Sequence, residues 1–146
     1  MNPEELIRDS FAGLNAHDEK RAYKNFAADL VVNGFLPEPI GLQEFMGLNA
    51  GVLGAFPDWH FEIKQVQTQG DKTTVNLQVS GTQNGPLMLP GMPEIPASGK
   101  KVSAPDRFIC TVGSDNMLHQ MDFDTPPGGG FASVLMQLGV DMSGMH

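Results

Sequence analysis

Hydrophobic residues recur at helical spacing near the start of the chain, and helix-start signals stand in the right places. Asn2-Pro3-Glu4-Glu5 combines a capping side chain, a proline suited to the first turn and two acids that favour a helix N-terminus. Asp18 is placed to cap a second helix, whose apolar stripe is expected to include Phe26. A short strand is expected at residues 30–32, and a third helix from residue 42 to about residue 55.

Later in the chain the pattern changes to period two, which is typical of β-strands with one buried face. A terminal helix is expected around Phe131–Leu138. Helices followed by hairpin-connected strands predict an α+β fold, with the helices packed on one face of an antiparallel sheet. With 146 residues, the chain has the length of a single domain, expected to span residues 1–146. The expected strands lie near residues 59–64, 75–80, 101–112 and 116–124.

One connection, Gln83–Lys100, is much longer than a hairpin turn and contains prolines, glycines and large apolar residues. A loop of this length inside a compact domain is usually functional or disordered. Its apolar content favours packing over a cavity, and a contact between the subunits of a dimer is the alternative.

A carboxylate stands on an otherwise apolar strand face. Asp106 alternates with Ala104, Phe108 and Cys110. If a three-residue turn joins the last two strands, Asp106 faces Asp122. Two carboxylates on one apolar surface raise at least one pKa through desolvation and repulsion. Such a group is suited to act as a general acid or base near neutral pH.

The register of these two strands leaves a second arrangement open. A two-residue turn would set Arg107 opposite Asp122 and give a structural ion pair, with no role in catalysis. Trp59 and Tyr23 are the only large aromatic residues with a polar group. Either can line a ligand cavity and donate a hydrogen bond, or pack in the core with its donor satisfied.

The charge balance narrows the class of partner. The chain has 17 Asp and Glu against 9 Lys and Arg, a net charge of −8, and a surface of this sign repels nucleic acid and anionic membranes. No stretch reaches the length of a membrane span, and the charged N-terminus does not resemble a signal peptide, so a cytoplasmic location is expected. The single cysteine, Cys110, excludes an internal disulfide, and the histidines lack metal-site spacing, so no metal is expected.

Several stretches, taken in order, resemble the SnoaL-like polyketide cyclases, a family within the superfamily that shares the nuclear transport factor two fold. Each stretch is short, and the resemblance rests on the ordered set over about residues 4–140. The stretches are Ala55-Phe56-Pro57-Asp58-Trp59-His60-Phe61-Glu62-Ile63, Ser80-Gly81-Thr82-Gln83-Asn84-Gly85, Gly99-Lys100-Lys101-Val102, Met117-Leu118-His119-Gln120-Met121-Asp122 and Leu135-Met136-Gln137-Leu138-Gly139.

The resemblance implies a cone-shaped, strongly curved antiparallel sheet that packs against N-terminal helices and encloses one apolar pocket. It also implies ring closure of a polycyclic aromatic polyketide ester by an intramolecular aldol reaction, with no metal and no cofactor. The general acid/base of the family falls on Asp122. Gln120 and Gln83 stand where relatives often carry histidine, and Phe108 where they often carry an acid. The expected substrate-binding residues are Trp59, Gln83, Asp106, Phe108, Gln120 and Tyr23.

Two alternatives to a cyclase stay open. One is an epoxide hydrolase or isomerase of the same fold that uses Asp106, Arg107 and Asp122 as a polar cluster. The other is a non-catalytic module that binds an apolar small molecule or dimerises. A closed apolar pocket that contains Asp122 favours an enzyme, and a filled interior with Asp122 exposed favours the module.

A homodimer is also expected, because the last strand places several apolar side chains on the convex face of the sheet. A partly apolar face of this kind is usually covered. The residues concerned are Met117, His119, Met121 and Phe123.

Overall fold

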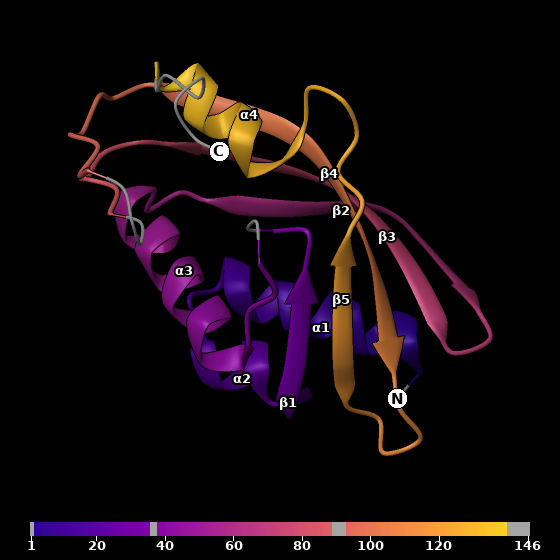
Figure 1. Cartoon of the computed structure of the whole chain (residues 1–146). Helices are drawn as coiled ribbons and strands as arrows, with labels where there is room; N and C mark the ends of the chain where they lie inside the picture. Colours follow the sequence, from indigo (N-terminus) through magenta and orange to yellow (C-terminus); the bar gives the residue numbers. More distant parts are fainter. Residues whose placement is uncertain (1, 36–37, 89–92, 140–146) are drawn as a thin grey trace.

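The computed structural model describes residues 2–35, 38–88 and 93–139. Five strands form one sheet in the order β1-β5-β4-β3-β2, and the bent sheet curves around the N-terminal helices (Figure 1). The α+β class is therefore confirmed. The elements are α1 (Pro3–Asn15), α2 (Glu19–Tyr23), β1 (Phe26–Asn33), α3 (Leu42–Ala55), β2 (His60–Gln69), β3 (Lys72–Thr82), β4 (Lys101–Val112), β5 (Leu118–Phe123) and α4 (Gly130–Gln137).

The predicted helix starts are confirmed by their capping hydrogen bonds. The Asn2 side chain accepts from the Glu5 N–H over 2.8 Å, and Asp18 accepts from the Arg21 N–H over 3.1 Å. The second helix ends at Tyr23, however, and the expectation that Phe26 belongs to it is wrong. Phe26 begins β1, where it is buried and pairs with the last strand of the sheet.

The sheet is mixed rather than wholly antiparallel. The pairs β2–β3, β3–β4 and β4–β5 are antiparallel, as expected of hairpins, but β1 runs parallel to β5. No tight turn links β1 to its neighbour, since α3 and the three hairpin strands lie between them, and only tight turns force adjacent strands to be antiparallel.

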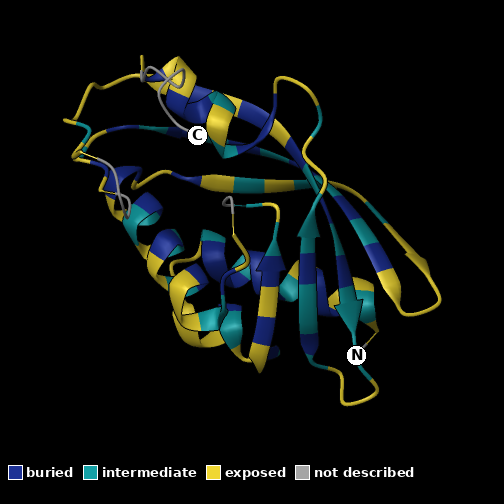
Figure 2. Cartoon of the chain, in the orientation of Figure 1, coloured by how far each residue is buried: buried dark blue, intermediate teal, exposed yellow. Residues whose placement is uncertain are grey.

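The alternation predicted for the central strands is confirmed. Along β3 and β4 buried positions alternate with more exposed ones (Figure 2). The buried positions form the inner face of the sheet and belong to one hydrophobic core with residues of the helices. Asp106 lies on this inner face, 8% exposed, with Ala104 and Phe108 as its buried neighbours on the same face.

The turn between β4 and β5 comes one residue later than expected. The Gly113 N–H donates to the Met117 carbonyl over 2.9 Å, which closes a loop of residues 114–116. Asn116 has a φ of 59°, a left-handed conformation that asparagine tolerates better than most residues. A further irregularity of the ladder precedes Val112.

Both registers predicted for this hairpin are therefore wrong. Asp122 pairs with Ile109 rather than with Asp106 or Arg107. Ile109 lies three positions from Asp106, and because side chains alternate with period two, an odd shift moves a residue to the opposite face. Asp122 thus lies on the outer face of the sheet, whereas Asp106 keeps its inward position.

The same shift removes much of the apolar surface on which the homodimer was predicted. Met121 is 1% exposed and belongs to the core, and Phe123 packs against Phe108 of β4 with ring centroids 5.4 Å apart. Both side chains were expected on the convex face, and both face inward instead. The homodimer itself stays a prediction.

Candidate functional site

An aromatic cavity lies between the inner face of the sheet and the helices. Its empty volume is about 540 Å³, a figure that includes open solvent at its mouth. The lining is almost wholly apolar. It consists of Phe11, Leu14, Phe35, Phe45, Asn49, Val52, Trp59, Phe61, Leu77, Val79, Asp106, Phe108, Phe123 and Phe131.

Phenylalanine rings form most of the cavity wall and hold one another in place. Phe108 stacks on Phe11 at 5.7 Å between ring centroids. At another part of the wall, Phe35 meets Phe123 at 5.2 Å and Phe131 at 6.1 Å. These rings come from α1, β4, β5, α4 and the segment after β1, so the wall exists only once the chain has folded. Flat, neutral ligands suit such a surface, because aromatic rings stack on aromatic rings.

Asp106 is the only ionisable residue among the described residues that line the cavity. Burial raises its pKa above the ordinary value of 3.8, and two hydrogen bonds oppose this shift. The Thr125 hydroxyl and the Arg107 N–H both donate to Oδ1, each over 2.8 Å. No described residue donates to Oδ2. Asp106 therefore brings to the cavity wall a carboxyl whose Oδ2 has no donor among the described residues and whose pKa is higher than that of a solvated aspartate.

Trp59 and Asn49 supply the other polar groups of the lining. Trp59 is buried, and its ring N–H has no acceptor within the described part of the chain. Asn49 donates to the Tyr23 hydroxyl over 3.0 Å. Tyr23 does not itself line the cavity, and burial raises the pKa of its hydroxyl. Of the two polar aromatic residues, Trp59 therefore lines the cavity, and Tyr23 contacts the lining residue Asn49 without lining the cavity itself.

Gln83 lies outside the cavity and anchors the long loop. It is fully buried, donates to the Ile95 carbonyl over 3.1 Å and accepts from the Ser98 hydroxyl over 2.7 Å. None of residues 83–88 and 93–100 lines the cavity. The sequence favoured packing of this loop over a cavity. That prediction is wrong for the described parts of the loop, since none of their residues lines the cavity.

Asp122 and Gln120 lie together on the outer face of the sheet. Gln120 Nε2 donates to both carboxylate oxygens of Asp122, over 2.9 and 3.0 Å, and Asn33 Nδ2 donates to one of them over 2.8 Å. Neither residue lines the cavity. The pocket containing Asp122, which the sequence predicted, is therefore replaced by a pocket containing Asp106.

The polar cluster expected of a hydrolase is likewise divided between two faces. The Arg107 guanidinium forms an ion pair with Asp124 on the outer side, while Asp106 faces the cavity. Asp106, Arg107 and Asp122 therefore do not converge on one substrate.

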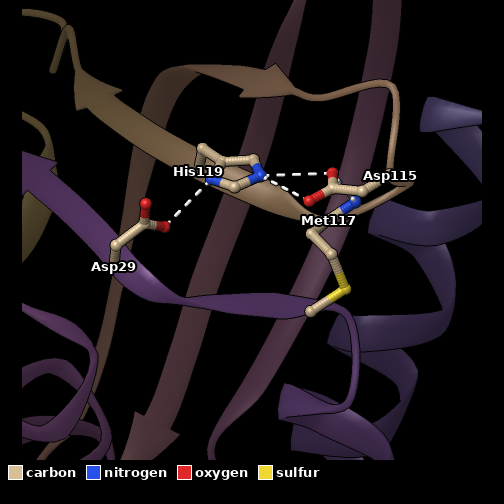
Figure 3. Close-up of polar contacts among 4 residues, drawn as sticks. All are labelled: Asp29, Asp115, Met117 and His119. Atoms are coloured by element: carbon tan, nitrogen blue, oxygen red, sulfur yellow. Dashed lines mark hydrogen bonds and ion pairs between the residues drawn. The ribbon is translucent and has the colours of Figure 1, made fainter.

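A second polar group lies at the far end of β5, away from the cavity. His119 bridges Asp29 of β1 and Asp115 of the β4–β5 turn, with Nδ1 2.9 Å from Asp29 and Nε2 2.9 Å from Asp115 (Figure 3). The hydrogen bonds to Asp115 and Asp29 raise the pKa of His119, and the bond from His119 lowers that of Asp115. These side chains tie the turn to the edge strand.

Three further features concern metal binding, the reactivity of the cysteine and membrane-spanning helices. Among the described residues, no group of three or more His, Cys, Asp or Glu side chains is placed to hold a metal ion. Burial raises the pKa of the Cys110 thiol to about 12, so the thiol is protonated and unreactive. No helix in the described ranges is long and apolar enough to cross a membrane.

Two polar residues of the site were missed by the sequence analysis. Asn49 follows Phe45 by four residues and precedes Val52 by three, so helical spacing could have placed it on the buried face of α3. Thr125 lies beyond the expected strand and had no sequence signal, because its contact with Asp106 depends on the register of β4 and β5.

Comparison with known proteins agrees with this architecture. A protein from Streptomyces galilaeus, AclR, described as a candidate hydroxylase, superposes with a TM-score of 0.75 at 20% identity, over 93% of this chain and 94% of that one. A candidate SnoaL-like polyketide cyclase from Jannaschia sp. CCS1 gives 0.75 at 19% identity, over 97% of each chain. IdmH from Streptomyces antibioticus, a candidate polyketide cyclase, gives 0.74 at 18%, over 96% and 100%. No curated protein matches the chain.

The class of this fold follows from its curved sheet, its N-terminal helices and its cavity. It is the nuclear transport factor two-like fold, to which a matching solved structure is assigned. Within that class, the family model of the SnoaL-like polyketide cyclases matches residues 5–120. The chain belongs to the SnoaL-like polyketide cyclase family.

Proposed function

We propose that the chain is an acid/base enzyme whose catalytic group is Asp106, acting without a metal or organic cofactor on a neutral aromatic ketone or polyketide ester. The observation that carries the proposal is that, among the described residues, one buried carboxyl lines a cavity walled by aromatic rings and has an oxygen, Oδ2, with no donor. We assign to Asp106 the role that the family resemblance implied for Asp122, because Asp106 lines the cavity and Asp122 does not.

The proposed reaction is an intramolecular aldol closure. Ionised Asp106 removes a proton from the carbon beside a carbonyl, and the resulting enolate attacks a second carbonyl, so that a C–C bond forms. The protonated carboxyl then returns the same proton to the new alkoxide. One group performs both transfers, and its raised pKa makes the carboxylate a stronger base than a solvated aspartate.

The lining also limits the substrate. The cavity offers no described cation to balance a carboxylate or phosphate, and ionised Asp106 would repel one, so we expect an uncharged ligand. The eight aromatic side chains of the lining suit a flat, unsaturated skeleton. Trp59 is the candidate donor to the developing enolate oxygen, because its buried N–H has no acceptor among the described residues.

The test uses 2-acetylnaphthalene, a neutral aromatic ketone, and measures deuterium uptake into its methyl group in D₂O by NMR. This exchange reports the first proton transfer without requiring the natural substrate. Asp106→Asn keeps the shape of the side chain and removes the base, so we expect the catalysed rate to fall by about 10²–10⁴-fold. Asp122→Asn is the matched control and should leave the rate little changed. Loss of exchange in Asp122→Asn but not in Asp106→Asn would overturn the assignment.

An isomerase of the same fold is the second candidate, since one carboxyl that takes and returns a proton also suits a double-bond shift. The epoxide hydrolase alternative loses its support, because its three polar residues lie on two faces of the sheet. A purely binding module predicts that Asp106→Asn keeps ligand affinity and that the wild type catalyses no exchange. The homodimer and the cytoplasmic location belong to this proposal as predictions from the sequence.

A further inference from the structure

The Asp106 carboxyl is held asymmetrically. Both hydrogen-bond donors, the Thr125 hydroxyl and the Arg107 N–H, point to Oδ1 over 2.8 Å. Oδ2 receives no hydrogen bond from any described residue. A carboxyl held by two donors on one oxygen keeps that oxygen as the acceptor, and its proton goes to the other oxygen.

Thr125 reaches Asp106 because the chain beyond β5 is built to approach β4 closely. The β4–β5 register, extended past Phe108 and Phe123, sets Thr125 beside Asp106. Two glycines then leave the room that this approach requires. A Cβ at Gly129 would lie 2.4 Å from the Pro105 carbonyl oxygen, and a Cβ at Gly130 would lie 2.6 Å from Thr125 Cγ2.

The glycine pair also connects Thr125 to the cavity wall. Gly130 has a φ of +73°, a left-handed conformation that favours glycine, and it begins α4. The next residue, Phe131, lines the cavity and stacks on Phe35. The segment 125–131 therefore holds the carboxyl with its first residue and closes part of the wall with its last.

We propose that Thr125 is a positioning residue for the acid/base group: its hydroxyl keeps Oδ1 as an acceptor and directs Oδ2, the proton-carrying oxygen, to the ligand. The catalytic meaning of this role rests on the proposed function. The orientation of the carboxyl does not, and it can be measured on the free protein.

The electrostatic surroundings make the role of Thr125 measurable. Leu77 of β3, Phe123 of β5 and Phe131 of α4 face the same cavity and carry no charge. The neighbouring charged side chains Arg107 and Asp124 pair with each other on the outer side. The two hydrogen bonds to Oδ1 thus remain as the main influence that favours the ionised form against burial.

The test is a titration of the Asp106 side-chain carboxyl carbon by ¹³C NMR, with the resonance assigned by its loss in Asp106→Asn. Thr125→Val removes the hydroxyl and keeps the branched shape, and we expect its titration midpoint to lie at higher pH than in the wild type. Thr125→Ser retains the donor and should titrate like the wild type. Because Thr125 is itself exposed, the valine variant is expected to fold, and Thr125→Ala provides a second form without the hydroxyl.

The outcomes separate this proposal from the proposed function. An unchanged or lower midpoint in both Thr125→Val and Thr125→Ala overturns the positioning role, whatever the activity. A raised midpoint supports it even if Asp106→Asn keeps full exchange activity, a result that would overturn only the catalytic assignment. With activity present, the pH of half-maximal exchange should move upward in Thr125→Val and stay in place in Thr125→Ser.

Discussion

Asp106 and Asp115 belong to the same β4–β5 hairpin, yet their surroundings shift their pKa values in opposite directions. Asp106 faces an aromatic cavity, and burial raises its pKa. Asp115 lies in the exposed turn, where the hydrogen bond from His119 lowers its pKa. Within one hairpin, a carboxyl that resists ionisation thus lies only nine positions from a carboxyl that is held ionised.

The difference shows how this fold separates a reactive group from a structural one. The outer carboxylates of Asp29 and Asp115 are exposed to solvent and pair with His119, so their ionisation costs little free energy. The two pairs hold the β4–β5 turn to β1. The inner carboxyl has hydrogen bonds but no cation among the described residues that line its cavity. A buried charge without a counter-charge is destabilising. Evolution tolerates such a cost mainly where the group has a function, which supports Asp106 as the catalytic residue.

The largest expected effect on stability comes from opening the inner region around Asp106 to solvent. Phe108→Ala removes a fully buried ring that packs against Phe11 and Phe123. We expect a loss of about 3–5 kcal/mol in the free energy of unfolding. We also expect the pKa of Asp106 to move down toward that of a solvated carboxyl. Urea unfolding and the ¹³C titration measure the two effects.

The matched control for this change is Ile109→Ala, the next residue of β4 on the outer face. It should cost less stability, because Ile109 is only half-buried, and should leave the titration of Asp106 in place. Equal effects of the two variants on the Asp106 titration would show that cavity dryness does not control this carboxyl.

A smaller effect on the free energy of unfolding has opposite signs in Asp106→Asn and Asp115→Asn. Asp106→Asn keeps an oxygen that can accept from Thr125 and Arg107 and removes the buried charge. We expect the variant to be more stable than the wild type at pH 7 by on the order of 1 kcal/mol, or about 2–4 °C in Tm. Asp115→Asn should instead be less stable than the wild type, because it loses the ion pair with His119.

The pH dependence of the Asp106 effect follows from the raised pKa. The folded protein binds the proton more tightly than the unfolded chain, so the wild type loses stability as the pH rises from about 3.8 through the folded-state pKa. The advantage of Asp106→Asn should therefore vanish in acid, below both pKa values. Thermal unfolding at pH 3.5 and pH 7 measures it, and an advantage of the same size at both pH values would contradict the explanation.

The smallest expected effect concerns His119. Its pKa is raised in the folded state, so its contribution to stability is fully present below the ordinary value of 6.5 and is lost as the pH rises through the folded-state pKa. In His119→Gln this dependence should disappear, so that the variant differs from the wild type more at pH 6 than at pH 8.5. Because the cluster is exposed, the difference will be small and weaker in high salt. Denaturant unfolding at the two pH values provides the measurement.

Much of the site could be predicted because it depends on local patterns. Alternation along β4 placed Asp106 and Phe108 on the buried face, and both line the cavity. Of the two places that the sequence left open for Trp59, the cavity wall and the core, the structure shows it at the cavity wall. Asp122 was misplaced because its face depends on a turn that begins one residue late and on an irregularity in the ladder. Neither feature leaves a periodic signal in the sequence.

By itself, the sequence determined the helix starts, the alternation of the strands and the presence of one acid on an apolar face, since each is set by neighbours a few residues away. Only the tertiary structure decided which acid faces the cavity. A strand side chain changes face with every single-residue shift in register. That register is set at the left-handed Asn116 in the turn and by the packing of Met121 and Phe123 against the core. It brought Thr125 to Oδ1 of the inward-facing Asp106 and placed Asp122 on the outer face.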